Sequence, residues 1–536
     1  MKRLSEMGLQ SYRLPLVFWR LQNWVSAGNV DARGLVFGFV FGFFVRLVPE
    51  VLAFSSPIGW DTIYYATVMK SGVVWANWGQ FFTTTWLLHA VTVPLYSLSG
   101  IDPFVLLKVV APALYGLTSA GVYWFGRKLL RWDVKMCLVA VGLFAVQLAS
   151  LRVSWDFLRN TLGMGILLFT LPLVERVSSR RGFVAFVVLS LLTVFAHEYA
   201  AVTWVFVVSG LLVWNLVKGR FNVGSVRILL AGLPALTVFA VGMYLRFFPV
   251  RFESTALNVL SDGEASAGRY GFMVNYLAVS GTNWSYATYW SLFYEVVLLF
   301  AFLYLPYLFL VWKGYFKNCV LNLWLGLLLI GAFGCLVVPF FALDLWARWM
   351  FLLVYPFTFY AVYGLFRIYQ SSARGGLLVY RAKLVAVAGL VMVFLIGFAY
   401  LFTPLLAQTE NYGVIPVGIS VHFGAAPTVP YQDVEGVTQA LRWLDANMEN
   451  DSFVVLHHAL LPWGRLYLDK SHTMVEYYDN AEEAVNVGLD HSFAYAFCVW
   501  WEEPISWYNV SLPKGFVGVQ DFGRISVYAY EGENLG

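Results

Sequence analysis

The sequence predicts a polytopic α-helical membrane bundle, about 11 transmembrane helices, followed by a C-terminal α/β domain. Of the 536 residues, 60% are hydrophobic and 12% charged, whereas ordinary soluble domains have roughly 45–50% apolar and about 25% charged residues. Long apolar runs recur between residues 34 and 402, and short amphipathic patterns replace them in 403–536. Lipid is therefore the expected solvent for most of the chain.

Charge and cysteine content exclude some classes of function. The net charge of +4 is small, and no basic run is interleaved with exposed aromatic residues, so we expect no nucleic-acid partner. The four cysteines have neither metal-ligand spacing nor the pattern of a disulfide framework.

A spanning helix needs about 20 mostly apolar residues. The sequence offers eleven such segments, several of them short: 34–54, 104–126, 134–150, 157–175, 182–196, 199–217, 226–248, 289–312, 320–341, 349–366 and 384–402.

The loops between these segments predict the orientation of the bundle. If the N-terminus is cytoplasmic, the cytoplasmic flanks collect 21 of the 35 Lys and Arg residues. Short-loop Lys and Arg are retained in the cytoplasm, which predicts an N-in, C-out topology. We therefore expect a multi-pass protein of the plasma membrane with an extracellular C-terminal domain.

Three regions follow from this topology. Residues 1–33 lack a cleavable signal pattern, and 14–24 either lie flat at the cytoplasmic interface or are disordered. Residues 34–402 form the transmembrane domain, whose external loop 55–103 contains a short apolar piece, 85–98, expected to be an interfacial helix. Residues 403–536 form the external domain.

Residues 403–536 alternate helical and strand patterns, which is typical of a small α/β domain. The last strand segment is expected to be a hairpin that turns near Gly523. The pattern predicts helices at 437–448 and 481–490 and strands at 452–460, 493–501 and 516–531.

Ionisable residues gather near the external ends of the predicted spans. Inserting one such side chain at membrane depth costs about 2.5–3.5 kcal/mol, which indicates that these residues have a function there. The topology puts four separate turns on one side of the membrane, as expected for an active site at a membrane surface. Their polar residues are Asp61, Asp156, His197 with Glu198, and Asp344 with Arg348.

The turn at Asp61 resembles the first external loop of the GT-C superfamily of polyprenyl-phosphate-sugar-dependent glycosyltransferases, which includes protein O-mannosyltransferases and lipid A aminoarabinose transferases. The resemblance rests on a short pattern and continues through the Asp156 and His197 turns and the span from Arg348 to Pro356. The pattern consists of Asp61, Tyr65, Ala66, Met69, Gly72 and Trp75.

Two departures narrow the expected reaction. Protein O-mannosyltransferases have Asp-Glu where this chain has Asp61-Thr62, so a second carboxylate is missing. Oligosaccharyltransferases carry a WWDYG signature where this tail offers only CVWWEEP at 498–504. The resemblance therefore implies a monosaccharide transferase that moves a sugar from a polyprenyl-phosphate-linked donor to a lipid, glycan or protein acceptor in contact with membrane lipid.

Such a transfer needs a base for the acceptor proton and positive charge for the departing phosphate. We assign Asp61 as the base and Arg348 as the phosphate clamp. Asp156, His197 and Glu198 are candidates to hold a divalent cation, Mg²⁺ or Mn²⁺. The aromatic residues beside Asp61 either stack on a sugar or anchor the membrane interface; they are Trp60, Tyr64 and Tyr65.

Structural roles compete with each assignment. Asp61 could cap a helix or pair with Lys70, and Arg348 could pair with Asp344. Asp156 could bind Arg152 or Arg159, and the 197–198 turn could simply be solvated. Arg46 and Glu50, one helical turn apart, are expected to neutralise each other.

Two other functions compete with the transferase. A transporter, flippase or polymerase of lipid-linked glycans would have the same polytopic appearance, but transporters carry charges and broken helices near mid-membrane. In this chain, most unexplained charges lie near external span ends. A binding module on a membrane anchor would not need eleven spans.

Overall fold

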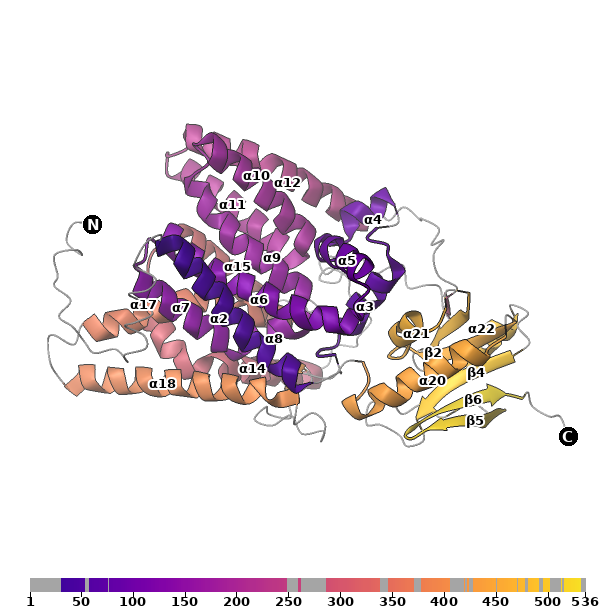
Figure 1. Cartoon of the computed structure of the whole chain (residues 1–536). Helices are drawn as coiled ribbons and strands as arrows, with labels where there is room; N and C mark the ends of the chain where they lie inside the picture. Colours follow the sequence, from indigo (N-terminus) through magenta and orange to yellow (C-terminus); the bar gives the residue numbers. More distant parts are fainter. Residues whose placement is uncertain are drawn as a thin grey trace.

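The computed structural model places most of the chain in two bodies, a helical bundle and a small α/β domain (Figure 1). Residues 14–24 and Asp344 lie outside the part that it describes. The described residues are 30–53, 57–75, 77–247, 259–261, 286–337, 346–370, 377–404, 419, 422–423, 428–449, 451–469, 471–477, 481–490, 495–501, 512 and 515–531.

Helices form at all eleven predicted spans. By length and apolar composition, eight helices among the described residues can cross a membrane, or nine if the bent pair α7 and α8 is one span. The bundle consists of α2 (Val30–Leu52), α6 (Pro103–Lys128), α7 (Val134–Val146), α8 (Leu148–Asp156), α9 (Leu158–Thr170), η2 (Leu171–Glu175), α10 (Arg180–Ala196), α11 (Glu198–Val217), α12 (Val223–Phe247), α14 (Tyr286–Gly314), α15 (Cys319–Val337), α16 (Trp346–Leu352), α17 (Val354–Gln370) and α18 (Leu377–Leu401).

The predicted spans 157–175 and 182–196 correspond to shorter helices. Helix α9 has 13 residues and α10 has 17, fewer than the 20 or so that cross a bilayer. The count of eleven spans, like the N-in, C-out orientation, stays a prediction.

Polar residues break the bundle helices at two points, one inside the predicted span 134–150 and one in the predicted turn at 197–198. The Gln147 side chain accepts the Ser150 N–H at 3.1 Å, where α7 and α8 meet at 62°. At the junction of α10 and α11, His197 Nδ1 accepts the Tyr199 N–H at 3.1 Å. Each cap satisfies an amide that the new helix leaves without an intrahelical partner.

The external loop 55–103 is mostly helical. It contains α3 (Thr62–Ser71), α4 (Trp78–Thr83) and α5 (Leu87–Ser99). Helix α5 confirms a helix at 85–98, whereas its position along a membrane surface stays a prediction. Asn77 caps α4 by accepting the Gln80 N–H at 2.9 Å.

The tail forms the predicted α/β domain, and the helices and strands expected at the five segments are confirmed. The sequence analysis missed β1, β3 and α21. The sheet order is β1-β3-β2-β4-β6-β5, built from β1 (Val259–Ser261), β2 (Ser452–His457), β3 (Thr473–Tyr477), β4 (Tyr495–Trp501), β5 (Phe516–Phe522) and β6 (Ile525–Tyr530), with η5 (Tyr431–Asp433), α20 (Val434–Asn447), α21 (Leu461–Tyr467) and α22 (Ala481–Asp490).

Strand β1 comes from the loop between α12 and α14, not from the tail. It pairs in parallel with β3, with Val259 opposite Met474 and Ser261 opposite Glu476. Strands β5 and β6 form the predicted hairpin around Gly523, whose φ is +80°. A loop of the bundle and the tail therefore share one sheet.

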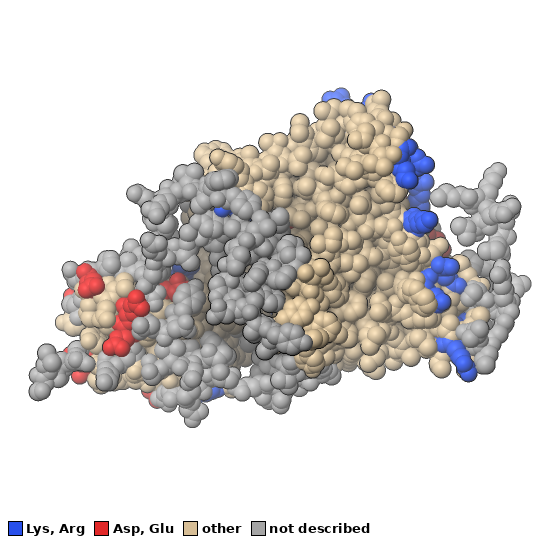
Figure 2. All heavy atoms as spheres, turned by 180° about the vertical axis from the view of Figure 1, so that it is seen from behind, with Lys and Arg blue, Asp and Glu red and all other residues tan. Residues whose placement is uncertain are grey.

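The tail domain packs on the external loop of the bundle. Trp463 of α21 and Phe104 at the start of α6 have ring centroids 5.9 Å apart, and Lys70 Nζ of α3 donates to the Leu466 carbonyl. Figure 2 shows Lys and Arg gathered at the end of the bundle opposite this domain. The end of the bundle that carries α3 to α5 is thus the end covered by the tail.

Candidate active site at Asp61

Asp61 lies directly before α3, half-buried, at the end of the bundle beside the tail. Within the described residues, its carboxylate has no hydrogen bond or ion pair, and it does not cap α3. The expected alternatives of a cap or a pair with Lys70 are therefore wrong, since Lys70 bonds Leu466. Burial raises the pKa of the Asp61 carboxyl, the Asp156 charge raises it further, and nearby arginines oppose this.

Asp156 positions the turn that carries Asp61. Its Oδ2 accepts the Trp60 N–H at 3.2 Å, and its carbonyl accepts the Tyr65 hydroxyl at 3.0 Å. Gly59 has φ +86°, and a Cβ placed on it would overlap Asp156. Only glycine fits both the left-handed backbone and the close approach.

The alternative of a bond between Asp156 and Arg152 is confirmed. Arg152 Nη1 forms an ion pair with Asp156 Oδ1, and Nη2 lies 3.4 Å from Oδ2. Arg152 Nε also donates to the His422 carbonyl in the segment that leads into the tail. Asp156 is therefore a fully bonded residue that holds other groups in place.

Arg348 stands in the first turn of α16 with its guanidinium 4.8 Å from the centroid of the Phe157 ring. Arg152 lies 4.6 Å from the same ring. Among the described residues Arg348 has no ion pair or hydrogen bond, and Asp344, its expected structural partner, lies outside them. Arg348 acts electrostatically on Asp61 and on His197, so the predicted residues do converge.

The turn at His197 and Glu198 also lies close to Arg348. Burial holds the pKa of the His197 imidazole well below its usual range, and Arg159 and Arg348 lower it further. The ring is therefore neutral, with Nδ1 as an acceptor. Glu198 forms an ion pair with Arg246 of α12. Both side chains thus have structural partners: His197 bonds the Tyr199 amide within the turn, and Glu198 pairs with Arg246 of α12.

The predicted cation site gains no support from this arrangement. Asp156 and Glu198 are each paired with an arginine, and within the described part of the chain no three His, Cys, Asp or Glu side chains gather as metal ligands would. We derive no step through a cation, and its involvement stays a prediction.

The three aromatic residues beside Asp61 differ in exposure. Tyr65 is buried, and its hydroxyl bonds the Asp156 carbonyl, which makes it a structural residue in this state. Tyr64 is half-buried and Trp60 is 43% exposed. Of the three, Trp60 and Tyr64 have surface available to a ligand.

Sequence reasoning missed the basic character of the site. Arg159 donates to Thr85 Oγ1 at 3.1 Å and acts on both Asp61 and Glu198. Among the described residues, Arg152, Arg246 and Arg348 bring the arginines to four, against the three carboxylates of Asp61, Asp156 and Glu198. A signal was available, because these arginines are exceptions to the cytoplasmic concentration of positive charge.

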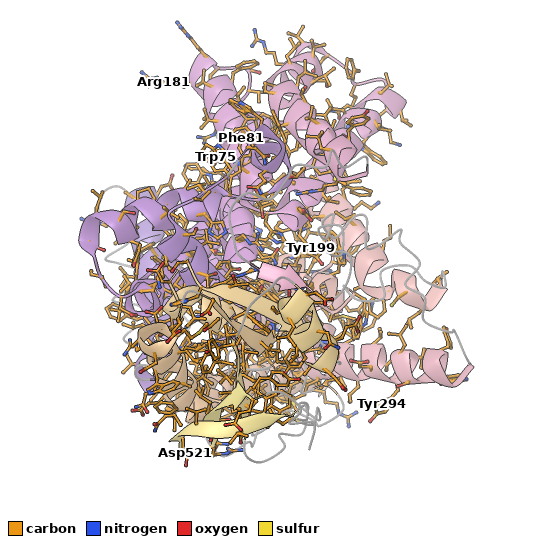
Figure 3. The ribbon with its side chains drawn as sticks, turned by 90° about the vertical axis from the view of Figure 1, so that its right-hand side faces the viewer. Trp75, Phe81, Arg181, Tyr199, Tyr294 and Asp521 are labelled. Atoms are coloured by element: carbon orange, nitrogen blue, oxygen red, sulfur yellow. The ribbon has the colours of Figure 1, made fainter. Side chains whose placement is uncertain are left out.

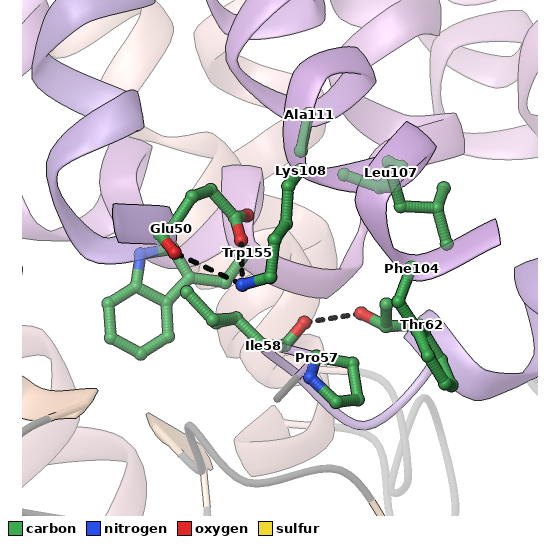
Figure 4. Close-up of a pocket in the computed structure, with 10 residues that line it drawn as sticks. Glu50, Pro57, Ile58, Thr62, Phe104, Leu107, Lys108, Ala111 and Trp155 are labelled. Carbon is green, nitrogen blue, oxygen red and sulfur yellow. Dashed lines mark hydrogen bonds and ion pairs between the residues drawn. The ribbon is translucent and has the colours of Figure 1, made fainter. Parts of the chain in front are cut away.

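A second ionic cluster lies nearby, and each of its charged side chains has an ionic partner within the cluster. Arg46 Nη2 is 2.7 Å from Glu50 Oε1, as predicted, and Lys108 Nζ is 3.3 Å from Glu50 Oε2. Arg46 Nε donates to the Ser154 carbonyl of α8 at 3.1 Å. Figure 4 shows Glu50 and Lys108 lining a small cavity with Thr62, the residue after Asp61.

Two solved structures are similar to this chain. No family model matches the chain, and no curated protein does. Among solved structures, it is similar to ArnT from Cupriavidus metallidurans in the apo state, with a TM-score of 0.48, 15% identity, and coverage of 93% of this chain and 98% of that one. It is also similar to the archaeal oligosaccharyltransferase AglB from Archaeoglobus fulgidus, solved with an inhibitory peptide and a dolichol-phosphate, with a TM-score of 0.44, 14% identity, and coverage of 89% and 70%.

Both structures share 15% identity or less with this chain. Both TM-scores lie below 0.5. The function of this chain is therefore argued from its own residues.

Proposed function

We propose that this protein is a GT-C-type membrane glycosyltransferase that moves a sugar from a polyprenyl-phosphate-linked donor to an acceptor. The observation that carries the proposal is the pair of charged side chains without bonded partners in the described structure, Asp61 and Arg348. Asp156 is paired with Arg152 and Glu198 with Arg246, and Arg159 bonds the neutral Thr85 hydroxyl. A base and a guanidinium group that act on each other electrostatically and remain available are what transfer from a phosphate requires.

The excess of arginine favours an anionic ligand. Within the described part of the chain, four guanidinium groups against three carboxylates leave positive charge in a partly buried site, where unpaired charge is costly. A phosphate group would neutralise this charge, and guanidinium groups match its geometry with two parallel N–H bonds. The Arg348 guanidinium, stacked on Phe157, is held with its N–H groups available.

The proposed step uses the two free groups. The Asp61 carboxylate removes the proton from an acceptor hydroxyl or amine, whose oxygen or nitrogen then bonds the sugar carbon C1. The bond from C1 to the phosphate oxygen breaks, and the departing polyprenyl phosphate is stabilised by Arg348. The raised pKa of Asp61 suits this role, since a stronger base takes the proton more readily once it is ionised.

The proposed location follows from the sequence asymmetry. With the Lys- and Arg-rich end of the bundle in the cytoplasm, Asp61 and the tail domain would face the extracytoplasmic side of the plasma membrane. An acceptor of lipid, glycan or protein class would then reach the site between the bundle and the tail. The domain division at 33 and 402 forms part of this proposal.

The experiment uses the full chain in lipid nanodiscs with a panel of polyprenyl-phosphate-linked monosaccharides. We expect transfer or hydrolysis of at least one donor, and a loss of about 10²–10⁴-fold in the Asp61→Asn variant. Glu482→Gln, a charge change at an exposed site on α22 of the tail domain, is the control and should keep full activity. No turnover of any donor by the wild type, or full activity of Asp61→Asn, would contradict the proposal.

A further inference from the structure

A cluster of aromatic rings covers the outer surface of the loop between α3 and α5. Trp75 and Phe81 have centroids 5.3 Å apart, Trp75 and Trp86 4.9 Å, and Trp86 and Phe195 4.7 Å. Trp78 packs on Phe81 at 5.5 Å. Figure 3 shows Trp75 and Phe81 together beside the bundle helices, away from the sheet. We call these five rings the aromatic cluster.

The cluster is well exposed although it is apolar. Trp78 is 75% exposed and Trp75 is 40% exposed, next to Val73 at 47%. In the described structure, neither indole N–H has a hydrogen-bond partner, whereas Trp86 donates to the Phe81 carbonyl at 2.9 Å. Two exposed indoles, each with a free donor, are unusual on a water-facing loop.

The position of the cluster relative to the bundle is fixed. Arg246, in the last turn of α12, donates through Nε to the Thr83 carbonyl at 3.1 Å. A Cβ on Gly242 of α12 would overlap the Phe82 carbonyl, so α4 lies directly against that helix. Helix α12 is a candidate membrane span, and the cluster therefore lies level with the end of a span.

The outward surface of α12 is apolar and exposed along its length. Leu229, Leu230 and Leu233 are 43%, 54% and 49% exposed, and Tyr244 near its end is 63% exposed. A surface of this kind on a membrane span faces lipid. The cluster lies at the end of the same helix but against its buried side, where Gly242 and Arg246 contact α4.

We propose that the aromatic cluster inserts into the headgroup region of the bilayer and seats the Asp61 loop on the membrane. Tryptophan favours this depth because its ring is apolar and its N–H can bond headgroup oxygens. Asp61 and Arg159 are coupled to this surface, since α3 leads into it and Thr85, which Arg159 bonds, lies directly before Trp86. Lipid contact at the cluster thus sets the depth of the catalytic groups.

A spin label tests the proposal without any assumption about catalysis. In a variant with the four native cysteines replaced by serine or alanine, Trp78→Cys carries a nitroxide in nanodiscs of phosphatidylcholine and phosphatidylglycerol. We expect relaxation by oxygen to exceed relaxation by a water-soluble nickel complex. Val519→Cys on β5, 46% exposed, is the matched control and should show the reverse.

Three outcomes would overturn the proposal. One is a label at 78 that only the nickel complex relaxes. A second is protection of that label by soluble monosaccharide, which would make the cluster a sugar platform. A third is protection that appears only as protein concentration rises, which would make it a contact between copies of the chain. A Trp78→Phe variant, used in tryptophan quenching by brominated lipids, checks the result in a protein that retains its cysteines.

Discussion

Two ionic clusters lie close together at one end of the bundle, and they differ in whether their charges are satisfied. In the Arg46, Glu50 and Lys108 cluster, every charged side chain bonds another, and Arg46 also bonds the end of α8. In the Asp61 cluster, Asp61 and Arg348 have no bonded partner among the described residues. The first arrangement fixes helices, whereas the second keeps a base and a cation available for a ligand.

The largest expected difference between the two clusters is in how a substitution changes the thermal stability of the protein. Glu50 is 5% exposed and binds two cations, and removing one partner of a buried ion pair costs about 3–5 kcal/mol. Glu50→Gln should therefore strongly lower the midpoint of thermal unfolding. Asp61→Asn should leave the unfolding midpoint unchanged or raise it, because the Asp61 carboxylate is partly desolvated and bonds none of the described residues. Equal losses in the two variants would remove the distinction between the clusters.

Removal of the Arg348 guanidinium should chiefly lower the rate of donor turnover. Arg348→Gln removes the proposed phosphate donor, and one such donor is typically worth about 10²–10³-fold in rate. Arg348→Lys should fall between this variant and the wild type, since lysine keeps the charge but not the fork. Arg131→Gln, which breaks an exposed pair with Glu175, is the control. Full donor turnover by Arg348→Gln would exclude the clamp.

Two glycines with positive φ provide a test of the Asp156 contact. Alanine at Gly59 or Gly72 must adopt a left-handed backbone, which costs about 1–2 kcal/mol, but only at Gly59 does its Cβ meet Asp156. Gly59→Ala should therefore be the less stable variant and lose more activity. Circular dichroism melts and donor turnover measure both effects. Equal effects of the two substitutions would mean that Asp156 does not hold the turn.

The pH profile should respond in opposite directions to the two neighbours of Asp61. Because the pKa of Asp61 is raised, the acid limb of kcat/KM should lie above the ordinary aspartate range, and activity should fall as pH drops through it. Arg348→Gln removes a charge that lowers this pKa and should move the limb to higher pH. Asp156→Asn removes a charge that raises it and should move the limb lower. Shifts of the same sign would show that another group titrates.

Much of this arrangement could be predicted from local patterns. The length of the apolar runs predicted the helices. The polar turns at 61, 156, 197 and 348 meet because each lies at the same end of a bundle helix. The pairing of Arg46 with Glu50 followed from helical spacing alone. These features depend on periodicity and on residues close in the sequence.

What sequence reasoning missed depends on distant contacts. Strand β1 has three residues and no pattern of its own, and it is a strand only because β3 lies beside it. Lys70 bonds a carbonyl 396 residues away, so its expected partner Asp61 was a wrong guess from proximity. The sequence neighbours Tyr64 and Tyr65 looked equivalent, yet packing buries one and leaves the other half-exposed.

The most direct test of the central contrast is the affinity of the full-length protein for a short-chain polyprenyl phosphate in nanodiscs. If Asp61 and Arg348 face one anion, Arg348→Gln should weaken binding by about tenfold or more, the loss of one charge-assisted bond. Asp61→Asn should keep or increase the affinity, because it removes a negative charge from the pocket. Undiminished binding by Arg348→Gln, or equal losses in both variants, would contradict the account.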